Sequence, residues 1–248
     1  MAFNPNIPYN ELPLLPPKEE IETKTVLKKT ISASRALAEL KGATNSIPNP
    51  EILITSIILQ EAKSSSAIEN VVTTNDKLFK SFSAKADISD PQTKEVLRYR
   101  EALWEGFNQL KKNELLTTNL FIKIFQKIKE SDAEIRRTTG TKLADGSGKV
   151  IYTPPEGEQL IRKLLYNLEQ FINNDSNIDP LIKSAIIHYQ FEAIHPFTDG
   201  NGRAGRMILI LYLILQKYLS LPVLFLSRYI IDNKAQYYKL LRGVTEKK

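Results

Sequence analysis

Cysteine is absent from this chain of 248 residues. Its absence excludes disulfides, zinc–thiolate centres and thiol nucleophiles, and it fits the reducing cytosol, so we expect a cytoplasmic protein. Apolar runs of about 18 residues are also missing, so no membrane span is expected. The first 17 residues are rich in proline but lack the basic segment and the apolar segment of a signal peptide.

Charge of one sign is in small excess. The chain has 34 basic and 28 acidic residues, a formal net charge of +6, and its lysines are scattered. This pattern favours an ordinary solvated surface over a nucleic-acid surface, so no nucleic-acid partner is expected. Apolar residues make up 42% of the chain, enough for a sizeable core, and the length fits one large domain or two small ones.

Helical patterns cover most of the chain. A capping residue followed by proline marks helix starts at Asn49-Pro50, Asp90-Pro91, Thr153-Pro154 and Asp179-Pro180. We expect helices over 17–41 (closed by Gly42), 50–62, 91–112, 154–174, 180–195, 203–218 and 233–244, and another from Thr117 or Thr118 to about 130.

One segment departs from the helical pattern. Residues 138–153, TTGTKLADGSGKVIYT, place DGSG between two short β-prone pieces. We predict a hairpin with its turn at Asp145–Gly148. Two uses are open for it: a plain connector, or an exposed edge on which a partner peptide docks by adding a strand.

The stretch HPFTDGNGRAGR, residues 195–206, carries the strongest functional pattern. Pro196 is expected to end the preceding helix, because proline lacks an N–H and clashes with the turn before it. Gly200 and Gly202 allow positive φ and a close approach of the backbone to a ligand. The following helix is apolar on nearly all sides, which is typical of a central, buried helix. Its N-terminus is therefore expected to be a rigidly held anion site.

Charged and titratable side chains gather around that N-terminus. Arg203 and Arg206 are fixed cations suited to phosphate oxygens. Asp199 is a carboxylate that could anchor Mg²⁺ whose other ligands are phosphates and waters. His195 is a base that titrates near neutral pH. Together these residues predict chemistry at a nucleotide phosphate.

His188 is the other of the two histidines in the chain. It lies seven residues before His195, on roughly the same helix face. A metal site is disfavoured, because no third ligand and no i,i+4 spacing accompany the pair. We expect a hydrogen-bonded structural histidine.

Residues 195–206 resemble the Fic signature, HPF-x-(D/E)-GNGR-x-x-R, at every specified position. Upstream, Ser65, Glu69 and Asn70 resemble the family's inhibitory motif: Ser or Thr, three residues, Glu, then Gly or Asn. The hairpin resembles the family's flap, and Tyr237-Tyr238 also fit the family. The resemblance implies an all-α fold, a Fic-type helical bundle with a small β-hairpin flap. It places the inhibitory motif in a helical region at 1–112 and the catalytic core at 113–248.

The resemblance also implies a reaction, the transfer of AMP from ATP to a hydroxyl of a target protein, with Mg²⁺. His195 is similar to the family's general base, Asp199 to its Mg²⁺ ligand and Phe197 to a core anchor. The positions similar to the family's nucleotide-binding residues are Gly200, Asn201 and Gly202 (anion hole), Arg203 (diphosphate), Arg206 (γ-phosphate), Ala204 and Gly205 in the same stretch, and Tyr237 (adenine pocket). A target with an exposed Ser, Thr or Tyr is expected to dock on the hairpin at 138–153.

Glu69 has two readings. Without the resemblance, SSSAIEN is a short helix with a solvated glutamate. With it, Glu69 pairs with Arg206 in cis, and an arginine so occupied cannot hold the γ-phosphate. Two rival functions stay open beside autoinhibited AMP transfer: removal of AMP by a water that Glu69 positions, and a non-catalytic nucleotide sensor. A homodimer is also left open.

Overall fold

The structure is a computed structural model that describes residues 3–45, 50–84 and 90–246. Over these residues the chain forms helices and one two-stranded sheet, which confirms the expected all-α class. The elements are α1 (Lys24–Asn45), α2 (Pro50–Ile68), α3 (Asn75–Ala84), α4 (Pro91–Asn113), α5 (Thr118–Lys129), β1 (Leu143–Ala144), β2 (Val150–Tyr152), α6 (Glu158–Asn173), α7 (Pro180–Ile194), α8 (Asn201–Leu215), α9 (Leu226–Asp232) and α10 (Lys234–Glu246).

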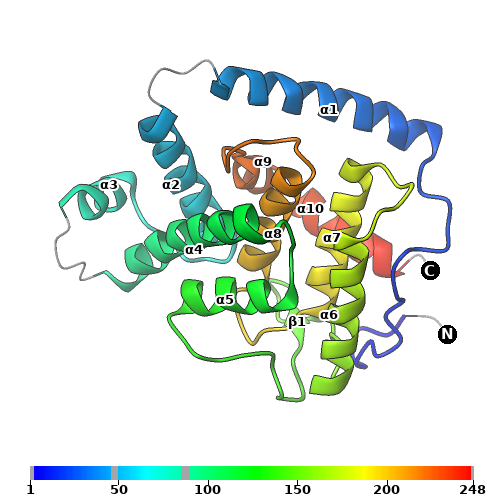
Figure 1. The fold of residues 1–248 in the computed structure, drawn as a ribbon. Coiled ribbons are helices and arrows are strands. Elements are labelled where there is room, and N and C mark those ends of the chain that lie inside the picture. The colour runs from blue at the N-terminus through cyan, green and yellow to red at the C-terminus, as the bar shows by residue number, and fades with distance from the viewer. Residues whose placement is uncertain (1–2, 46–49, 85–89, 247–248) are drawn as a thin grey trace.

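Helix α8 is the centre of the fold. In Figure 1 it lies in the middle of the molecule, and it packs against α2, α4, α5 and α7. Met207, Ile210, Leu211 and Tyr212 on it are fully buried. The helix that is apolar on nearly all sides is thus the buried one, as predicted. The loop before it is attached to the most enclosed element of the molecule.

The predicted hairpin is present. Leu143 in β1 pairs with Tyr152 in β2 in an antiparallel ladder. The turn between them is closed by Asp145, whose carboxylate accepts the backbone N–H groups of Ser147 and Lys149. Gly148 has a φ of +83°, a conformation that costs glycine least. The turn chemistry read from DGSG is therefore confirmed.

Three of the expected helix starts are confirmed by their caps. The carboxylate of Asp90 accepts the N–H of Thr93, and that of Asp179 accepts the N–H of Leu181. Thr117 accepts the N–H of Leu120 at the start of α5. Asn49 lies outside the described residues, although α2 begins at Pro50 as expected.

The expectation at Thr153-Pro154 is wrong. Helix α6 begins at Glu158, after Gly157 with a φ of +94°. Pro155 follows Pro154 directly, and a residue before proline is driven away from helical geometry. The Thr153 hydroxyl meanwhile donates to the carbonyl of Pro5 and does not cap a helix.

The first helix is also displaced from its expected range. It begins at Lys24, because Thr23 accepts the N–H of Val26, and it continues through Gly42 to Asn45. Gly42 is thus an interior position of the helix and not its end. Helix α2 likewise extends to Ile68, beyond the expected 62, and includes the three serines of the inhibitory motif region.

Two short helices were not predicted. Helix α3 has a local cap that the sequence offered, the Thr74 hydroxyl accepting the N–H of Lys77. Helix α9 has a remote one: the buried Glu61 carboxylate accepts the N–H and hydroxyl of Ser227. A cap supplied from 166 residues away leaves no local pattern.

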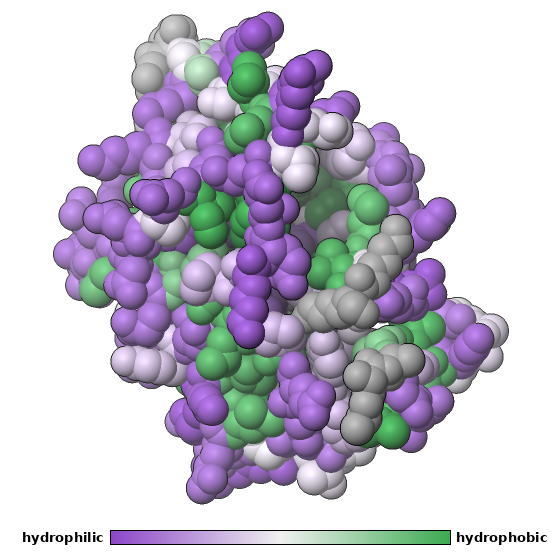
Figure 2. Space-filling model, turned by 90° about the vertical axis from the view of Figure 1, so that its right-hand side faces the viewer, coloured by the Kyte–Doolittle hydropathy of each residue, from purple (hydrophilic) through white to green (hydrophobic). Residues whose placement is uncertain are grey.

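Within the described ranges, no helix is long and apolar enough to cross a membrane. On the face drawn in Figure 2, hydrophilic side chains are interspersed with hydrophobic ones.

Candidate functional site

The turn between α7 and α8 presents the signature residues. His195 follows the last residue of α7 with φ 50° and ψ 59°, and its N–H donates to the carbonyl of Phe191. This is a left-handed helix end, closed by Pro196, which cannot continue the helix. Gly200, also left-handed with a φ of +73°, immediately precedes α8. The first N–H groups of α8 thus point into the same turn that carries His195.

Two internal contacts hold this turn. The Asn201 side chain accepts the N–H of Phe197 and donates to its carbonyl, at 2.9 and 2.8 Å. The Phe197 ring is fully buried and stacks on Phe125 with centroids 4.1 Å apart. The side chain of Asn201 therefore clamps the loop, and only its backbone faces the predicted anion site.

Glu69 is placed by the end of α2. The N–H of Val71 donates to the carbonyl of Ser66, and that of Asn70 to the carbonyl of Ala67. These two bonds form a Schellman motif with Asn70 in the left-handed position, at a φ of +64°. This conformation explains why Gly or Asn suits the last position of the motif. It turns Glu69 off the helix end toward α8.

One carboxylate binds both signature arginines. Glu69 Oε2 lies 3.0 Å from Arg203 Nε, and Glu69 Oε1 lies 2.8 Å from Arg206 Nη2. Ser65 completes the contact, because its hydroxyl and its carbonyl each accept from Arg206 at 2.8 Å. Both arginines are almost fully buried and Glu69 is one-fifth exposed. The expected Glu69–Arg206 pair is present, and the pair with Arg203 is additional.

The Glu69 carboxylate also lies against the glycine turn. A Cβ built on Gly202 would collide with Glu69 Oε1 and come within 2.9 Å of Arg206 Nη1. The side chain therefore fills the space over the N-terminus of α8, where an anion is stabilised by free N–H groups and the helix dipole. In this conformation the predicted phosphate cradle is occupied by a carboxylate.

A second charged group was missed by the sequence reasoning. Lys129, at the end of α5, contacts Asp199 at 2.7 Å and Glu95 of α4 at 2.8 Å. Glu95 also lies 2.6 Å from Arg203 Nη1. Burial disfavours the charged forms of Lys129 and Glu95, but their oppositely charged partners outweigh it. The pKa of Lys129 is therefore raised and that of Glu95 is lowered. No local pattern links positions 95, 129 and 199, so only the packing of α4, α5 and α8 brings them together.

Asp199 fits the role of a single-carboxylate metal ligand. Its side chain is 62% exposed at the rim of the cradle, and it already holds a cation, the Lys129 ammonium. Burial raises its pKa, but the Lys129 contact outweighs this and the pKa is lower than usual. The described residues contain no cluster of three or more metal-ligating side chains. Mg²⁺ bound mainly by phosphates and water needs only one or two carboxylates, so the donor set is adequate.

His195 is held as a neutral imidazole. Burial and the nearby Arg136 cation lower its pKa to about 4, against smaller opposing effects of the Glu192 carbonyl and Asp199. Nδ1 of the ring is buried without a hydrogen-bond partner among the described residues. A ring with its proton on Nδ1 leaves Nε2 free to accept one, as a general base must.

The predicted adenine side contains Tyr237 on α10. Its hydroxyl lies 2.7 Å from His188 Nε2, so His188 is hydrogen-bonded to protein, as expected. Beside them Glu192 Oε1 is buried without a hydrogen-bond partner among the described residues and lies where a Cβ on Gly205 would be 2.5 Å away. Burial raises the pKa of Glu192 to about 7, against the attraction of Arg206.

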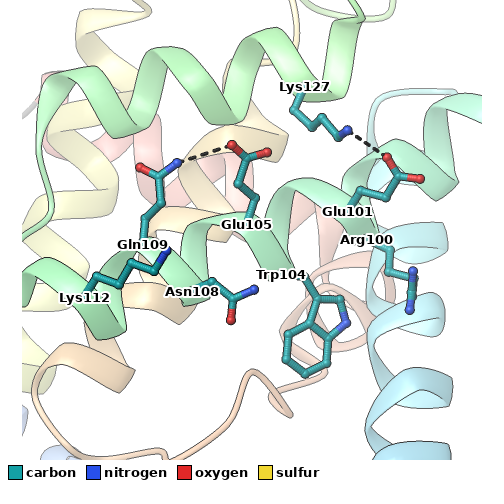
Figure 3. Close-up of a pocket in the computed structure, with 8 residues that line it drawn as sticks. All are labelled: Arg100, Glu101, Trp104, Glu105, Asn108, Gln109, Lys112 and Lys127. Atoms are coloured by element: carbon teal, nitrogen blue, oxygen red, sulfur yellow. Dashed lines mark hydrogen bonds and ion pairs between the residues drawn. The ribbon is translucent and has the colours of Figure 1, made fainter.

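A hollow on the outer face of α4 contains none of these residues. Figure 3 shows the side chains that line it, with Lys127 paired to Glu101 at 3.0 Å. Its lining residues are Arg100, Glu101, Trp104, Glu105, Asn108, Gln109, Lys112 and Lys127. Because no signature residue is among them, we place the candidate site at the α7–α8 turn.

Comparison with known sequences finds two matching family regions. Residues 27–108 match the Fic/DOC family N-terminal region, and residues 109–213 match the Fic/DOC family domain. Protein adenylyltransferase fic-1 of Caenorhabditis elegans is 34% identical over 92 residues, 36% of this chain and 17% of that protein. A probable protein adenylyltransferase of Aquifex aeolicus is 33% identical over 95 residues, 38% of this chain and 27% of that protein. The aligned stretch thus spans less than a third of either relative.

Solved structures share the fold. A Fic family protein from Desulfovibrio desulfuricans G20 superposes with a TM-score of 0.72 at 24% identity, over 94% of this chain and 70% of that one. Fic-1 (residues 134–508) of C. elegans gives a TM-score of 0.65 at 20% identity, over 90% of this chain and 68% of that one. With both family regions matched in order from 27 to 213 and this fold around the signature turn, the chain belongs to the Fic/DOC family.

Proposed function

We propose that this protein transfers AMP from ATP to a hydroxyl side chain of a target protein, and that Glu69 holds the reaction off in cis. The names of its relatives as adenylyltransferases support the reaction. The arrangement at the α7–α8 turn supports it independently. A neutral imidazole, a helix N-terminus and two buried arginines lie together there.

The chemistry assigned to these residues is a substitution at the α-phosphate of ATP. The target oxygen forms a bond to the α-phosphorus while the bond to the β-phosphate oxygen breaks, and pyrophosphate leaves. His195 accepts the proton of the attacking hydroxyl. The backbone at Gly200, Asn201 and Gly202, continuing through Ala204 and Gly205, holds the phosphates. Such catalysis is mostly positioning and charge stabilisation.

The remaining groups bind and orient. We assign Arg203 to the diphosphate and Arg206 to the γ-phosphate, the two arginines that Glu69 now occupies. Asp199 would hold Mg²⁺, which neutralises phosphate charge when bound. Tyr237 would contact adenine. The target would dock on the hairpin edge, and the reaction would take place in the reducing cytosol. Residues 1–112 would contain the inhibitory Glu69, and residues 113–248 would contain the catalytic groups.

The proposed inhibition by Glu69 is supported by one observation, the position of its carboxylate. It contacts Arg203 and Arg206 and lies against Gly202, so a triphosphate and this side chain compete for the same donors. Transfer then requires Glu69 to leave. A solvated surface glutamate would not be four-fifths buried and paired with two arginines.

Mass spectrometry of the transferred group tests the reaction. Glu69→Gly protein is incubated with Mg²⁺ and, separately, ATP, GTP, UTP and CDP-choline. We expect the mass of AMP on protein with ATP and its disappearance in Glu69→Gly/His195→Ala. A different adduct mass from another donor would replace the proposed substrate. Absence of any adduct, with ATP nevertheless bound, would favour a non-catalytic nucleotide sensor.

A second candidate uses the same site in the opposite direction. Because Glu69 remains one-fifth exposed at the cradle, it could orient a water that removes AMP from a modified target. Incubating an AMP-bearing target with both proteins separates the two functions. Release by the wild type but not by Glu69→Gly supports removal, whereas release by neither leaves transfer as the activity.

A further inference from the structure

Arg136 lies behind the predicted catalytic histidine and has no assigned role. It is in the segment between α5 and β1, is 2% exposed, and points toward the carboxyl end of α7. Its Nε donates to the carbonyl of His195 at 2.7 Å, and its Nη2 contacts the carbonyl of Ile194 at 3.4 Å. Its own N–H donates to the carbonyl of Pro196 at 2.9 Å. Three successive carbonyls around the turn are therefore held by one residue.

These contacts answer a structural need. The last carbonyls of a helix have no partner within the helix, and a cation is favoured there by the helix dipole. His195 is a non-glycine residue at positive φ, a conformation that persists only where the surroundings enforce it. Arg136 supplies both the donors and the charge at this turn.

The same guanidinium reaches the hairpin. Nη2 also donates to the carbonyl of Pro155, which follows β2, while Arg136 itself precedes β1. The two ends of the hairpin segment thus meet at this side chain. We propose that Arg136 is a positioning residue for His195: its guanidinium closes the carboxyl end of α7 and joins that turn to the base of the hairpin.

The charge of Arg136 acts on the imidazole as well. Among the described residues no carboxylate forms an ion pair with Arg136, although the Glu156 carboxylate is near enough to attract its charge. Burial of His195 and the charge of Arg136 favour the neutral ring. Asp199 and the Glu192 carbonyl favour the protonated ring. Loss of the Arg136 charge should therefore raise the pKa of His195.

The inference rests on the proposed role of His195, but its test does not require AMP transfer. With two histidines in the chain, NMR of the imidazole Cε1–H groups gives two signals, and His195→Ala assigns them. We expect Arg136→Gln to move the His195 midpoint to higher pH and to leave the His188 signal unchanged. Arg137→Gln is the matched control, because the neighbouring arginine is exposed and pairs with Glu158.

Activity in the Glu69→Gly background gives the second readout. We expect Arg136→Gln to lower the transfer rate about 10²-fold, the loss that a displacement of about 1 Å produces, and to move its acid limb upward. Arg136→Lys keeps the charge, so its His195 midpoint should stay near wild type while its rate still falls. An unchanged His195 midpoint in Arg136→Gln overturns the inference, as does full activity in Arg136→Lys.

Two failures remain distinguishable. If Arg136→Gln does not fold, His188 loses its contact with Tyr237 and its NMR signal shifts. The transfer rate of Arg136→Lys then tests the inference. If no variant transfers AMP, including the Glu69→Gly parent, the proposed function fails while the NMR midpoints still test Arg136.

Discussion

The Glu69 carboxylate fills the space that a side chain at Gly202 would need. Glycine within a helix normally costs stability, roughly 0.5–1 kcal/mol relative to alanine. Its presence in the first turn of α8 therefore has a local reason. That reason is an anion that lies directly against the backbone, the carboxylate here and a phosphate in the proposed reaction.

A double-mutant cycle tests this relationship. Gly202→Ala should lower the free energy of unfolding in the wild type, because the methyl group displaces Glu69. In the Glu69→Gly background the same change should cost less, since the carboxylate is gone and only the contact of the new methyl group with Arg206 Nη1 remains. Thermal unfolding of the four proteins gives the coupling free energy. Gly42→Ala, at an interior position of α1, is the control and should stabilise both backgrounds, because alanine favours a helix more than glycine does. Additive effects of Gly202→Ala and Glu69→Gly would refute the contact.

Adjacent serines provide a second comparison. The Ser65 hydroxyl accepts a bond from buried Arg206 at 2.8 Å, whereas the Ser66 hydroxyl is buried without a hydrogen-bond partner among the described residues. A hydrogen bond to a charged group contributes about 1.5–3 kcal/mol, so Ser65→Ala should destabilise by about that amount. Ser66→Ala should have little effect. Chemical denaturation measures both, and equal losses would mean that the Ser65–Arg206 bond does not hold the motif.

Lys129 is expected to compete with a divalent cation for Asp199. Removing its ammonium leaves Asp199 and Glu95 without the cation that they share. We predict that Lys129→Met binds Mn²⁺ about tenfold more tightly in the absence of nucleotide, a gain of about 1.4 kcal/mol. Lys127→Met is the matched control, since Lys127 pairs with the surface residue Glu101. A Mn²⁺ titration followed by electron paramagnetic resonance reports the affinity. Identical titration curves for both variants would show that Lys129 does not compete with Mn²⁺ for Asp199.

Glu192 makes stability depend on pH. Its pKa of about 7 in the folded protein exceeds the unfolded value near 4.5. The protonated carboxyl therefore stabilises the fold fully below about pH 4.5, and this stabilisation is lost as the pH rises through about 7. Relative to wild type, Glu192→Gln should gain stability between these two pH values. Unfolding free energies at pH 5 and pH 8 check the sign, and a pH-independent difference would contradict it.

Part of the site could be read from the sequence because it is contiguous. Residues 195–200 form one turn that leads directly into α8, and Pro196 and Gly200 each impose a local conformation that sequence alone specifies. Gly202 lies inside the helix and does not have the positive φ that its pattern allowed. The inhibitory motif was readable for the same reason. Asn70 ends α2 in a left-handed conformation, and this turn places Glu69.

The rest depends on packing between distant segments. Glu95, Lys129 and Arg136 acquire their partners, and Glu192 its burial, only when α4, α5 and α7 assemble around α8. Helix α9 was missed because its cap, Glu61, lies on α2. The start of α6 was misplaced because Thr153 bonds to Pro5 in the N-terminal segment. Except at α6, where Pro155 also disfavours a helix that begins at Pro154, the deciding contact is long-range.

The central claim is that a single carboxylate occupying the phosphate cradle keeps AMP transfer off. Incorporation of labelled AMP from ATP and Mg²⁺ measures it directly in wild type, Glu69→Gly and Glu95→Gln. The Glu95→Gln variant is the contrast, because it removes a second carboxylate that pairs with Arg203 and leaves the Glu69 carboxylate against Gly202. We predict strong labelling by Glu69→Gly alone, and its loss when His195→Ala is added. Wild-type labelling equal to that of Glu69→Gly would contradict the account.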